Sequence, residues 1–423
     1  MLGLTNKLFL GAVALTSVGF VYQEVSPFFL NIATVLFLVI ALINLKNFTF
    51  SARFMFVLPI LWLLGLVSGF WSPEKKTWTD LVVRQLPLFI IPLGFLALPL
   101  KSENRLNPSF VALILLIPIT LFGLATCLRY FLHFETINIA ISESKSVPVW
   151  NGFSPLNILS VNETGNFIES GVSHIYFSIL QGFAVILSVY NFKINPQPQI
   201  KLVFFIFGLI NILLIHLFLA RTGLIGLYAG AFAVAVAYII KSKNFKILPI
   251  GIGLIAVVFF IAYISYEPVQ RKVENIKMDL LANQGSLDKN DRSMAMRIEA
   301  WKTAVDRVSK NPIIGYGLGQ SKQVMETGYI ERNSSLRPEN RIGPHNQYLE
   351  TFLETGIFGL FLLVSVFILS FRAYGFSNYL ITAIISLIMT SMLFESILQR
   401  QLGIHFVSFV IGYMYFFFYP TKS

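Results

Sequence analysis

His345 is the residue of this sequence best suited to proton transfer. It follows Gly343–Pro344, a pair that fixes a turn, and precedes a helix predicted over 346–354. The positive end of that helix favours a neutral imidazole, which can accept a proton as a general base. The alternative is a histidine that only satisfies its hydrogen bonds at a membrane edge. Glu350 and Glu354 lie near the same helix start. They are expected to orient the histidine, to pair with an arginine or to face a polar cavity.

Arg221 is the second candidate, because it joins two apolar stretches with almost no loop. At the centre of a bilayer an arginine costs several kcal/mol, so it needs an interfacial position or an anionic partner. One interpretation is an arginine that reaches interfacial water. The other is an anion site, since Thr222–Gly223 let the backbone come close and the next helix offers free N–H groups.

Arg297 lies four residues before Trp301, so a helix would place both on one side. Ser293 is the predicted N-cap of this helix, and Asn311–Pro312 ends it. Its predicted apolar face comprises Ile298, Trp301, Val305 and Val308. The alternative interpretation is an amphipathic helix that rests on a membrane surface.

Gly315, Gly317 and Gly319 follow as G-x-G-x-G. No strand precedes them and no nucleotide-type helix follows, which argues against a dinucleotide site. The pattern favours a tight loop whose backbone approaches another group. His174, Arg84 and Glu395 each lie near a predicted span end. They are expected either to anchor the chain at the interface or to line a shared polar cavity.

The elements that position these residues are membrane spans. The chain has 423 residues, of which 55% are hydrophobic and 13% are charged, against about a quarter charged in soluble proteins. Its apolar blocks of about 17–22 residues are long enough to cross a bilayer. No small-residue cleavage site follows the first block, Leu8 to Val21, which favours a span over a removed signal peptide. The predicted fold is an all-α polytopic membrane protein with twelve spans, at 7–23, 27–45, 54–71, 84–98, 109–132, 172–192, 202–220, 223–240, 247–265, 347–371, 379–397 and 402–418.

The charges predict the topology. Basic residues gather in alternate short loops, which the positive-inside rule places in the cytoplasm together with both termini. The net charge of +11 is therefore a topology signal rather than a sign of nucleic-acid binding. Two long outer loops remain, at about 133–171 and 266–346. The predicted division is nine spans over 1–265, a helical outer loop over 266–346 and three spans over 347–423, all in one integrated membrane domain.

No metal or cofactor is predicted. The sequence has no H-x-x-x-H, C-x-x-C, D-x-D or Walker motif, and its single cysteine, Cys127, excludes a disulfide framework. The energy for any reaction must then come from the substrate or from a gradient.

Taken in order and spacing, these residues resemble the O-antigen ligase / O-antigen polymerase superfamily of bacterial inner-membrane proteins. The resemblance covers about 220–360, and the span pattern agrees over the whole chain. It rests on Arg221-Thr222-Gly223, Arg297 with Trp301, Asn311 to Gly319, His345-Asn346 with Leu349, and Glu354 to Gly359. His174 and the stretch Glu395 to Gln401 look like features of a subgroup.

The resemblance implies a GT-C-type glycosyltransferase of lipopolysaccharide biosynthesis, active on the periplasmic side without metal or ATP. The implied donor is a glycan on undecaprenyl pyrophosphate, and the implied acceptor is a sugar hydroxyl of lipid A–core. Arginines suit the charge that develops on a pyrophosphate leaving group, so Arg221 and Arg297 are expected to be catalytic together with His345 as the base. In-line attack predicts inversion at the anomeric carbon. The expected substrate contacts are Trp301, Gly315, Gly317, Asn346, Arg341, His174, Arg84 and Glu354.

Three alternatives stay open. A repeat-unit polymerase would show two comparable arginine-bearing outer loops. Here the first loop is acidic and only the second is arginine-rich, which favours the ligase. A related branch glycosylates protein side chains. A transporter for lipid-linked glycans would show mid-span ionisable residues, inverted repeats and broken helices, whereas these charges cluster at outer span ends and no repeat is visible.

Overall fold

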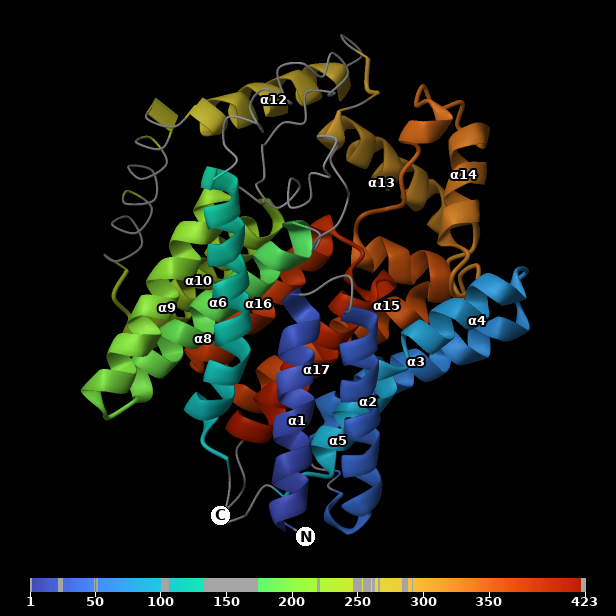
Figure 1. The fold of residues 1–423 in the computed structure, drawn as a ribbon. Helices are drawn as coiled ribbons and strands as arrows, with labels where there is room; N and C mark the ends of the chain where they lie inside the picture. The colour runs from blue at the N-terminus through green and yellow to red at the C-terminus, as the bar shows by residue number, and fades with distance from the viewer. Residues whose placement is uncertain are drawn as a thin grey trace.

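A computed structural model shows the chain as a bundle of long helices topped by shorter ones (Figure 1). It describes residues 2–21, 26–48, 50, 52–99, 106–132, 174–218, 221–245, 253, 260, 263–264, 267–283, 288–290 and 292–419. Within these ranges the regular elements are all helices. The α-helices are α1 (Leu2–Val21), α2 (Ser26–Ile43), α3 (Val57–Val67), α4 (Lys75–Arg84), α5 (Pro87–Leu96), α6 (Pro108–Leu132), α8 (His174–Ile194), α9 (Pro198–Leu217), α10 (Arg221–Ser242), α12 (Glu267–Asn283), α13 (Ser293–Lys310), α14 (Ser321–Glu331), α15 (Gln347–Tyr374), α16 (Tyr379–Phe394) and α17 (Gln401–Phe418).

The predicted fold class, a helical polytopic membrane protein, is confirmed. Ten helical segments of the described chain are long and apolar enough to cross a membrane, and α16 is a shorter apolar helix at the predicted span 379–397. The predicted span 247–265 lies almost entirely outside the described residues, as does the loop 133–171. Between α10 and α15 the described chain forms α12, α13 and α14, joined by non-helical stretches such as 311–320.

The fourth span differs from its prediction at 84–98. It begins at Lys75 with α4 and continues into α5 after a turn at 85–86. Arg84 therefore ends a helix inside this span instead of opening it. The polar residues of α4 hid its helix from a search for apolar blocks.

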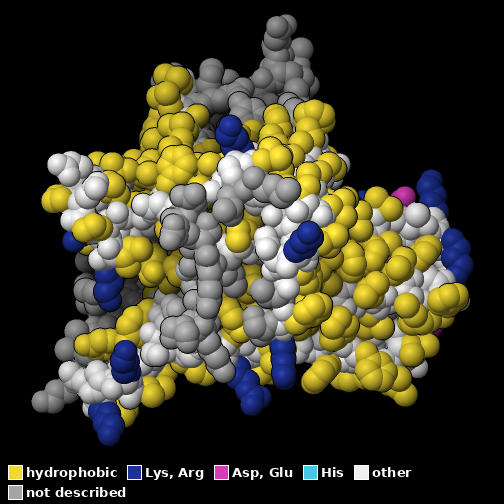
Figure 2. Space-filling model, turned by 90° about the horizontal axis from the view of Figure 1, so that it is seen from below, with side chains coloured by type: hydrophobic (Ala, Val, Ile, Leu, Met, Phe, Trp, Pro, Cys, Tyr) yellow, Lys and Arg dark blue, Asp and Glu magenta, His cyan; other side chains and the backbone are white. Residues whose placement is uncertain are grey.

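Both chain termini lie at one end of the bundle, and α12, α13 and α14 lie at the opposite end, called here the distal end (Figure 1). Figure 2 views the molecule from the side of the termini. Lys and Arg side chains are scattered over this face, whereas acidic side chains are visible only at its margin. Exposed basic residues lie at helix ends, such as Lys193 in α8 and Arg372 in α15, and in the connection after α2, such as Lys46.

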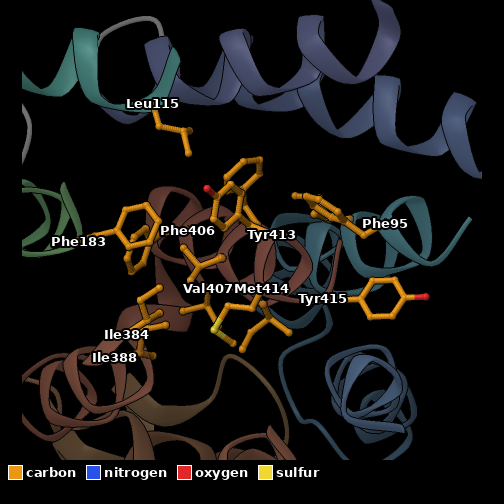
Figure 3. Close-up of a cluster of buried hydrophobic side chains, with 14 of the residues drawn as sticks. Phe95, Leu115, Phe183, Ile384, Ile388, Phe406, Val407, Tyr413, Met414 and Tyr415 are labelled. Carbon is orange, nitrogen blue, oxygen red and sulfur yellow. The ribbon is translucent and has the colours of Figure 1, made fainter. Parts of the chain in front are cut away.

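The centre of the bundle is α17. Of the 18 residues of α17, 83% are buried, the largest share among the candidate membrane spans. Phe406, Val407 and Met414 project from it into a cluster with side chains of surrounding helices, among them Phe95, Phe183 and Ile384 (Figure 3). This apolar core fixes both ends of α17, and so it fixes the chain segment that enters α17 at the distal end.

An interruption of α15 at Gly356 shapes the distal end. Gly356 has φ +66° and ψ −162°, which breaks the helical ladder and frees the carbonyls of the preceding turn. The glycine-rich loop before α14 satisfies them: Tyr316 N–H donates to Leu353 O at 2.8 Å, and Gly317 N–H donates to Glu354 O at 2.9 Å. Residues 347–355, the distal half of α15, are thereby joined to this loop.

The same loop also docks onto the connection between α3 and α4. Leu318 N–H donates to Ser68 Oγ at 2.9 Å, and Gln320 Nε2 donates to Ser72 Oγ at 2.8 Å. A side chain on Gly317 would meet Ser72 at 2.8 Å. The close backbone approach predicted for the glycines is thus made to the protein itself, from two sides.

Two details of α13 differ from prediction. Ser293 is its first helical residue rather than its N-cap, and Asp279 of α12 accepts from the Met294 N–H at 3.2 Å instead. The predicted apolar face is only partly right, because Val305 is 57% exposed. Small residues such as Ala300 and Ala304 form the buried face, since α13 packs closely against α14.

Replacing Gly356 by alanine is expected to destabilise the fold by about 3 kcal/mol or more. Its Cβ would lie 2.1 Å from Ile313 O, and its φ is unfavourable for any residue with a side chain. Gly375→Ala is the matched control, because Gly375 has φ +74° but a Cβ there would lie 3.8 Å from its nearest neighbour, Ser377 Oγ. Backbone strain alone should lower stability there by about 1–2 kcal/mol. Thermal unfolding midpoints of the purified variants measure both effects. Equal midpoints for the two variants would contradict the close packing at Gly356.

Candidate active site

His345 is held in an unusual backbone conformation. Its φ is +44°, in the left-handed region that residues with a side chain seldom adopt. Two contacts fix the chain around it. Trp301 Nε1 donates to Pro344 O at 2.9 Å, and the Asn346 side chain caps α15 by accepting from the N–H groups of Tyr348 and Leu349. The predicted place of His345 at a helix start is confirmed, and its strained backbone is typical of functional sites.

The His345 imidazole bonds to Glu395, which follows the last residue of α16. Nδ1 lies 3.1 Å from Glu395 Oε2, with the two side chains 32% and 6% exposed. Burial raises the pKa of the Glu395 carboxyl. The hydrogen bond with His345, the charge that His345 carries when it is protonated, and the positive charges of Arg297 and Arg400 outweigh burial, so the pKa of Glu395 falls below the ordinary 4.5. The carboxylate is therefore ionised near neutral pH and accepts from Nδ1–H. This tautomer leaves the Nε2 lone pair available to take a proton.

Arg297 reaches the same place from α13. Its Nη1 donates to the carbonyl of Phe394, the residue before Glu395. Trp301, one turn further along α13, donates to the residue before His345. The predicted shared side of Arg297 and Trp301 is thus confirmed, and α13 contacts the residue that precedes each partner of the His345–Glu395 pair.

The start of α10 lies at the same level of the bundle. Gly230 packs against the Ala383 backbone and Gly226 packs against Leu387 and Ser391, so α10 and α16 run antiparallel. From Gly226 the next turn toward the start of α10 reaches Arg221, and the matching turn of α16 reaches its end at Phe394. This pairing places Arg221 level with the end of α16. The described side chains do not include that of Arg221, so its direction stays a prediction.

The backbone at Gly223 approaches the protein itself, and the anion site predicted at Thr222–Gly223 stays a prediction. Gly223 N–H donates to Ser178 Oγ at 3.0 Å, and a Cβ on Gly223 would lie 2.3 Å from the Ser178 backbone. His174 begins α8, one turn before Ser178, so the starts of α8 and α10 lie side by side. The His174 side chain, too, is outside the described set.

A six-residue connection from Glu395 to Arg400, called here the 395–400 turn, is bonded to the distal half of α15. Ser396 Oγ donates to Glu350 Oε2 at 2.9 Å, Leu398 N–H donates to Gln347 Oε1 at 2.6 Å, and Gln399 Nε2 donates to Glu354 Oε2 at 2.9 Å. These three α15 side chains are buried.

Arg84 at the end of α4 also bonds to the turn, where its Nη1 donates to Gln399 O at 3.1 Å. Arg84 and Glu354 therefore both bond to Gln399, four residues after Glu395. Gln347 and Ser396 escaped the sequence prediction. The signal for Gln347 was present, because Gln347, Glu350 and Glu354 recur at helical spacing in an apolar span.

Other predicted substrate contacts are occupied within the protein. Arg341 forms an ion pair with Glu326 of α14, and its Nε donates to Leu336 O at 3.3 Å. Gly315 and Gly317 are buried in the docked loop. Substrate contacts by these three residues stay predictions.

Known proteins match the part of the chain that carries this site. Residues 203–364 match the family model described as O-antigen ligase. An O-antigen ligase of Salmonella typhimurium is 27% identical over 204 residues, which cover 48% of this chain and 46% of the relative. A protein of Rickettsia prowazekii named "Putative polysaccharide ligase" is 28% identical over 200 residues, 43% of this chain and 46% of the relative. The chain spans about half the length of these curated relatives.

The fold and site define a helical membrane protein with a polar, histidine-containing centre at one end. The resemblance predicted from the motifs is confirmed: residues 203–364 match the O-antigen ligase family model. That segment includes Arg221, Arg297 and His345, whereas Glu395 lies beyond it.

The lowered pKa of Glu395 predicts a pH-dependent contribution to stability. A depressed carboxyl pKa stabilises the fold above the ordinary value of 4.5, and this stabilisation disappears as the pH falls through the lower folded-state pKa. Wild type is therefore expected to exceed Glu395→Gln in thermal midpoint most strongly above pH 4.5 and to approach it as the pH falls through the lowered pKa. Thermal unfolding across this pH range is the measurement. A difference that does not change with pH would contradict an ionised, stabilising Glu395.

Proposed function

We propose that this protein is a glycan ligase that transfers a saccharide from undecaprenyl pyrophosphate to a sugar hydroxyl of lipid A–core. The observation that supports this most directly is the His345–Glu395 pair beside Arg297, in a segment that matches the O-antigen ligase family. A base next to fixed cations is what attack by a hydroxyl on a glycosyl pyrophosphate needs.

The reaction is proposed to occur on the periplasmic side of the bacterial inner membrane. Basic side chains mark the face with the two termini (Figure 2), and the positive-inside rule assigns such a face to the cytoplasm. The site lies toward the distal end, where α12, α13 and α14 gather. A lipid-linked donor would reach it from the membrane with its pyrophosphate at the bilayer edge.

His345 acts in this mechanism as the general base. The acceptor oxygen attacks the anomeric carbon as Nε2 takes its proton, and the bond from that carbon to the pyrophosphate oxygen breaks. Glu395 holds the imidazole in the Nδ1–H tautomer and stabilises the imidazolium that forms. Attack opposite the leaving group inverts the anomeric carbon.

Arg297 and Arg221 balance the charge that develops on the leaving pyrophosphate. A guanidinium stays charged and can donate two parallel hydrogen bonds to phosphate. The carbonyl of Phe394 already holds one Arg297 nitrogen, which limits the directions in which the rest of the group can donate. Arg221 at the first turn of α10 adds its charge to the positive end of that helix.

The interruption of α15 is the feature that a transporter would share. In such transporters the broken backbone coordinates ions or substrate near the bilayer centre. Here Tyr316 and Gly317 already bond the carbonyls freed at the break. The interruption therefore serves the docking of the loop, and transferase chemistry accounts for the His345–Glu395 pair more fully.

Replacing His345 by alanine is expected to lower transfer by about 10²–10⁴-fold, the usual contribution of a general base. Purified protein would be mixed with undecaprenyl-pyrophosphate glycan and lipid A–core in the presence of chelator, and the products separated by size. His216→Ala is the control, because the His216 ring bonds to Ile212 O and Tyr228 away from the 395–400 turn.

Three outcomes would contradict the proposal. Full transfer by His345→Ala would show that His345 is not the general base. Longer lipid-linked chains in place of modified core would identify a polymerase. A folded wild type that forms neither product would favour a different acceptor, such as a protein, or the transporter.

Arg297→Ala is expected to lower kcat by about 10²–10³-fold, because it removes a cation that acts mainly in the transition state. Arg297→Lys should recover only part of this loss, since an ammonium group cannot bond both Phe394 O and a phosphate with the guanidinium geometry. Steady-state kinetics with the same donor and acceptor would show it. A wild-type kcat for Arg297→Lys would indicate that only the positive charge matters and not the guanidinium geometry.

A further inference from the structure

Glu395 is not held in place by helical hydrogen bonds. It is the C-cap of α16, with an extended backbone at φ −150° and ψ 143°. Its carboxylate nevertheless meets His345 from a buried position. The contacts that aim it must therefore come from the residues on either side of Glu395 in the chain.

The contacts on both sides are present. Before Glu395, the Phe394 carbonyl accepts from Arg297. After it, the Ser396 hydroxyl donates to Glu350 Oε2 at 2.9 Å, the first contact between the 395–400 turn and α15. Glu350 is buried and is also hydrogen bonded to Ser321 at the start of α14.

Glu350 belongs to the same rigid unit that presents His345. Asn346 follows His345 and caps α15. The Glu350 N–H donates to Asn346 O at 2.9 Å, so Glu350 lies in the first turn of the helix. A hydrogen bond from Ser396 to Glu350 ties Glu395 to the unit that holds its imidazole partner. Leu398 and Gln399 also bond to this part of α15, but they lie three and four residues beyond Glu395. Ser396 is directly next to Glu395, so its bond limits the movement of the carboxylate most closely.

We propose that Glu350 and Ser396 are positioning residues that hold the Glu395 carboxylate against His345 Nδ1. This inference rests on the proposed function for its kinetic consequence, but its structural consequence is independent of any activity. Neither residue is assigned contact with substrate.

The test is Ser396→Ala, with Ser396→Thr as the variant that keeps the hydroxyl. Loss of the hydroxyl should lower kcat about 10- to 100-fold with KM unchanged, because a small misplacement of a catalytic group has effects of this size. Threonine should restore most of kcat. Ser365→Ala is a matched control, since Ser365 donates to Leu362 O at 2.7 Å in the other half of α15.

A double mutant separates positioning from a general structural role. If Ser396 acts through Glu395, Ser396→Ala should have no further effect on kcat in a Glu395→Ala background. Losses that multiply in the double mutant, a changed KM at unchanged kcat, or threonine as poor as alanine would each overturn the proposal.

A second measurement needs no substrate. Nitrogen NMR of ¹⁵N-imidazole-labelled protein reports which ring nitrogen of His345 carries the proton, with His345→Gln used to assign the signal. Wild type and Ser396→Thr should show the Nδ1–H form, and Ser396→Ala should show a mixture with Nε2–H. That result in a wild type that transfers no glycan would reject the proposed function and retain the positioning role. An unchanged tautomer in Ser396→Ala would overturn the positioning role even if wild type is an active ligase.

Discussion

The hydrogen bond between His345 and Glu395 is the interaction around which the distal end is organised. A buried carboxylate is unfavourable without compensation, and here the imidazole and nearby arginines supply it. Each partner is in turn fixed by an element from elsewhere in the chain. The cap of α15 and Trp301 of α13 hold the histidine, while Arg297 and the 395–400 turn hold the glutamate. The hydrogen bonds of this polar centre join α13, α15 and the turn between α16 and α17, so they connect separate helices.

The apolar bundle makes this arrangement possible. α17 is buried at the centre, so the turn that leads into it starts from a fixed point. The break at Gly356 then lets the distal half of α15 lie against that turn while the rest of α15 continues as a span. The glycine-rich loop satisfies the freed carbonyls and links the break to the α3–α4 connection. Glycines that look like a ligand loop in the sequence thus serve to join protein backbone to protein backbone.

The sequence predicts the spans and the chemistry of single residues better than their partners. Apolar length is local, so eleven of the twelve predicted spans correspond to described helices: ten long ones and α16. The place of His345 and the shared side of Arg297 and Trp301 follow from local rules of capping and helical spacing. The His345–Glu395 contact joins residues 50 positions apart and depends on how α16 ends beside α15, which no local pattern records. Gly356 belongs to the stretch that carries the family resemblance, but no local pattern predicts the break there, because the break depends on the backbone of Ile313.

The central claim is that Arg221, Arg297 and His345 act on one substrate. The most direct measurement is a cryo-electron microscopy structure with an undecaprenyl-pyrophosphate saccharide analogue that cannot be cleaved. We predict pyrophosphate oxygens within hydrogen-bonding distance of both guanidinium groups. The anomeric carbon should face the side on which His345 Nε2 receives the acceptor. A pyrophosphate bound elsewhere, or an Arg221 side chain directed away from Arg297, would contradict the mechanism.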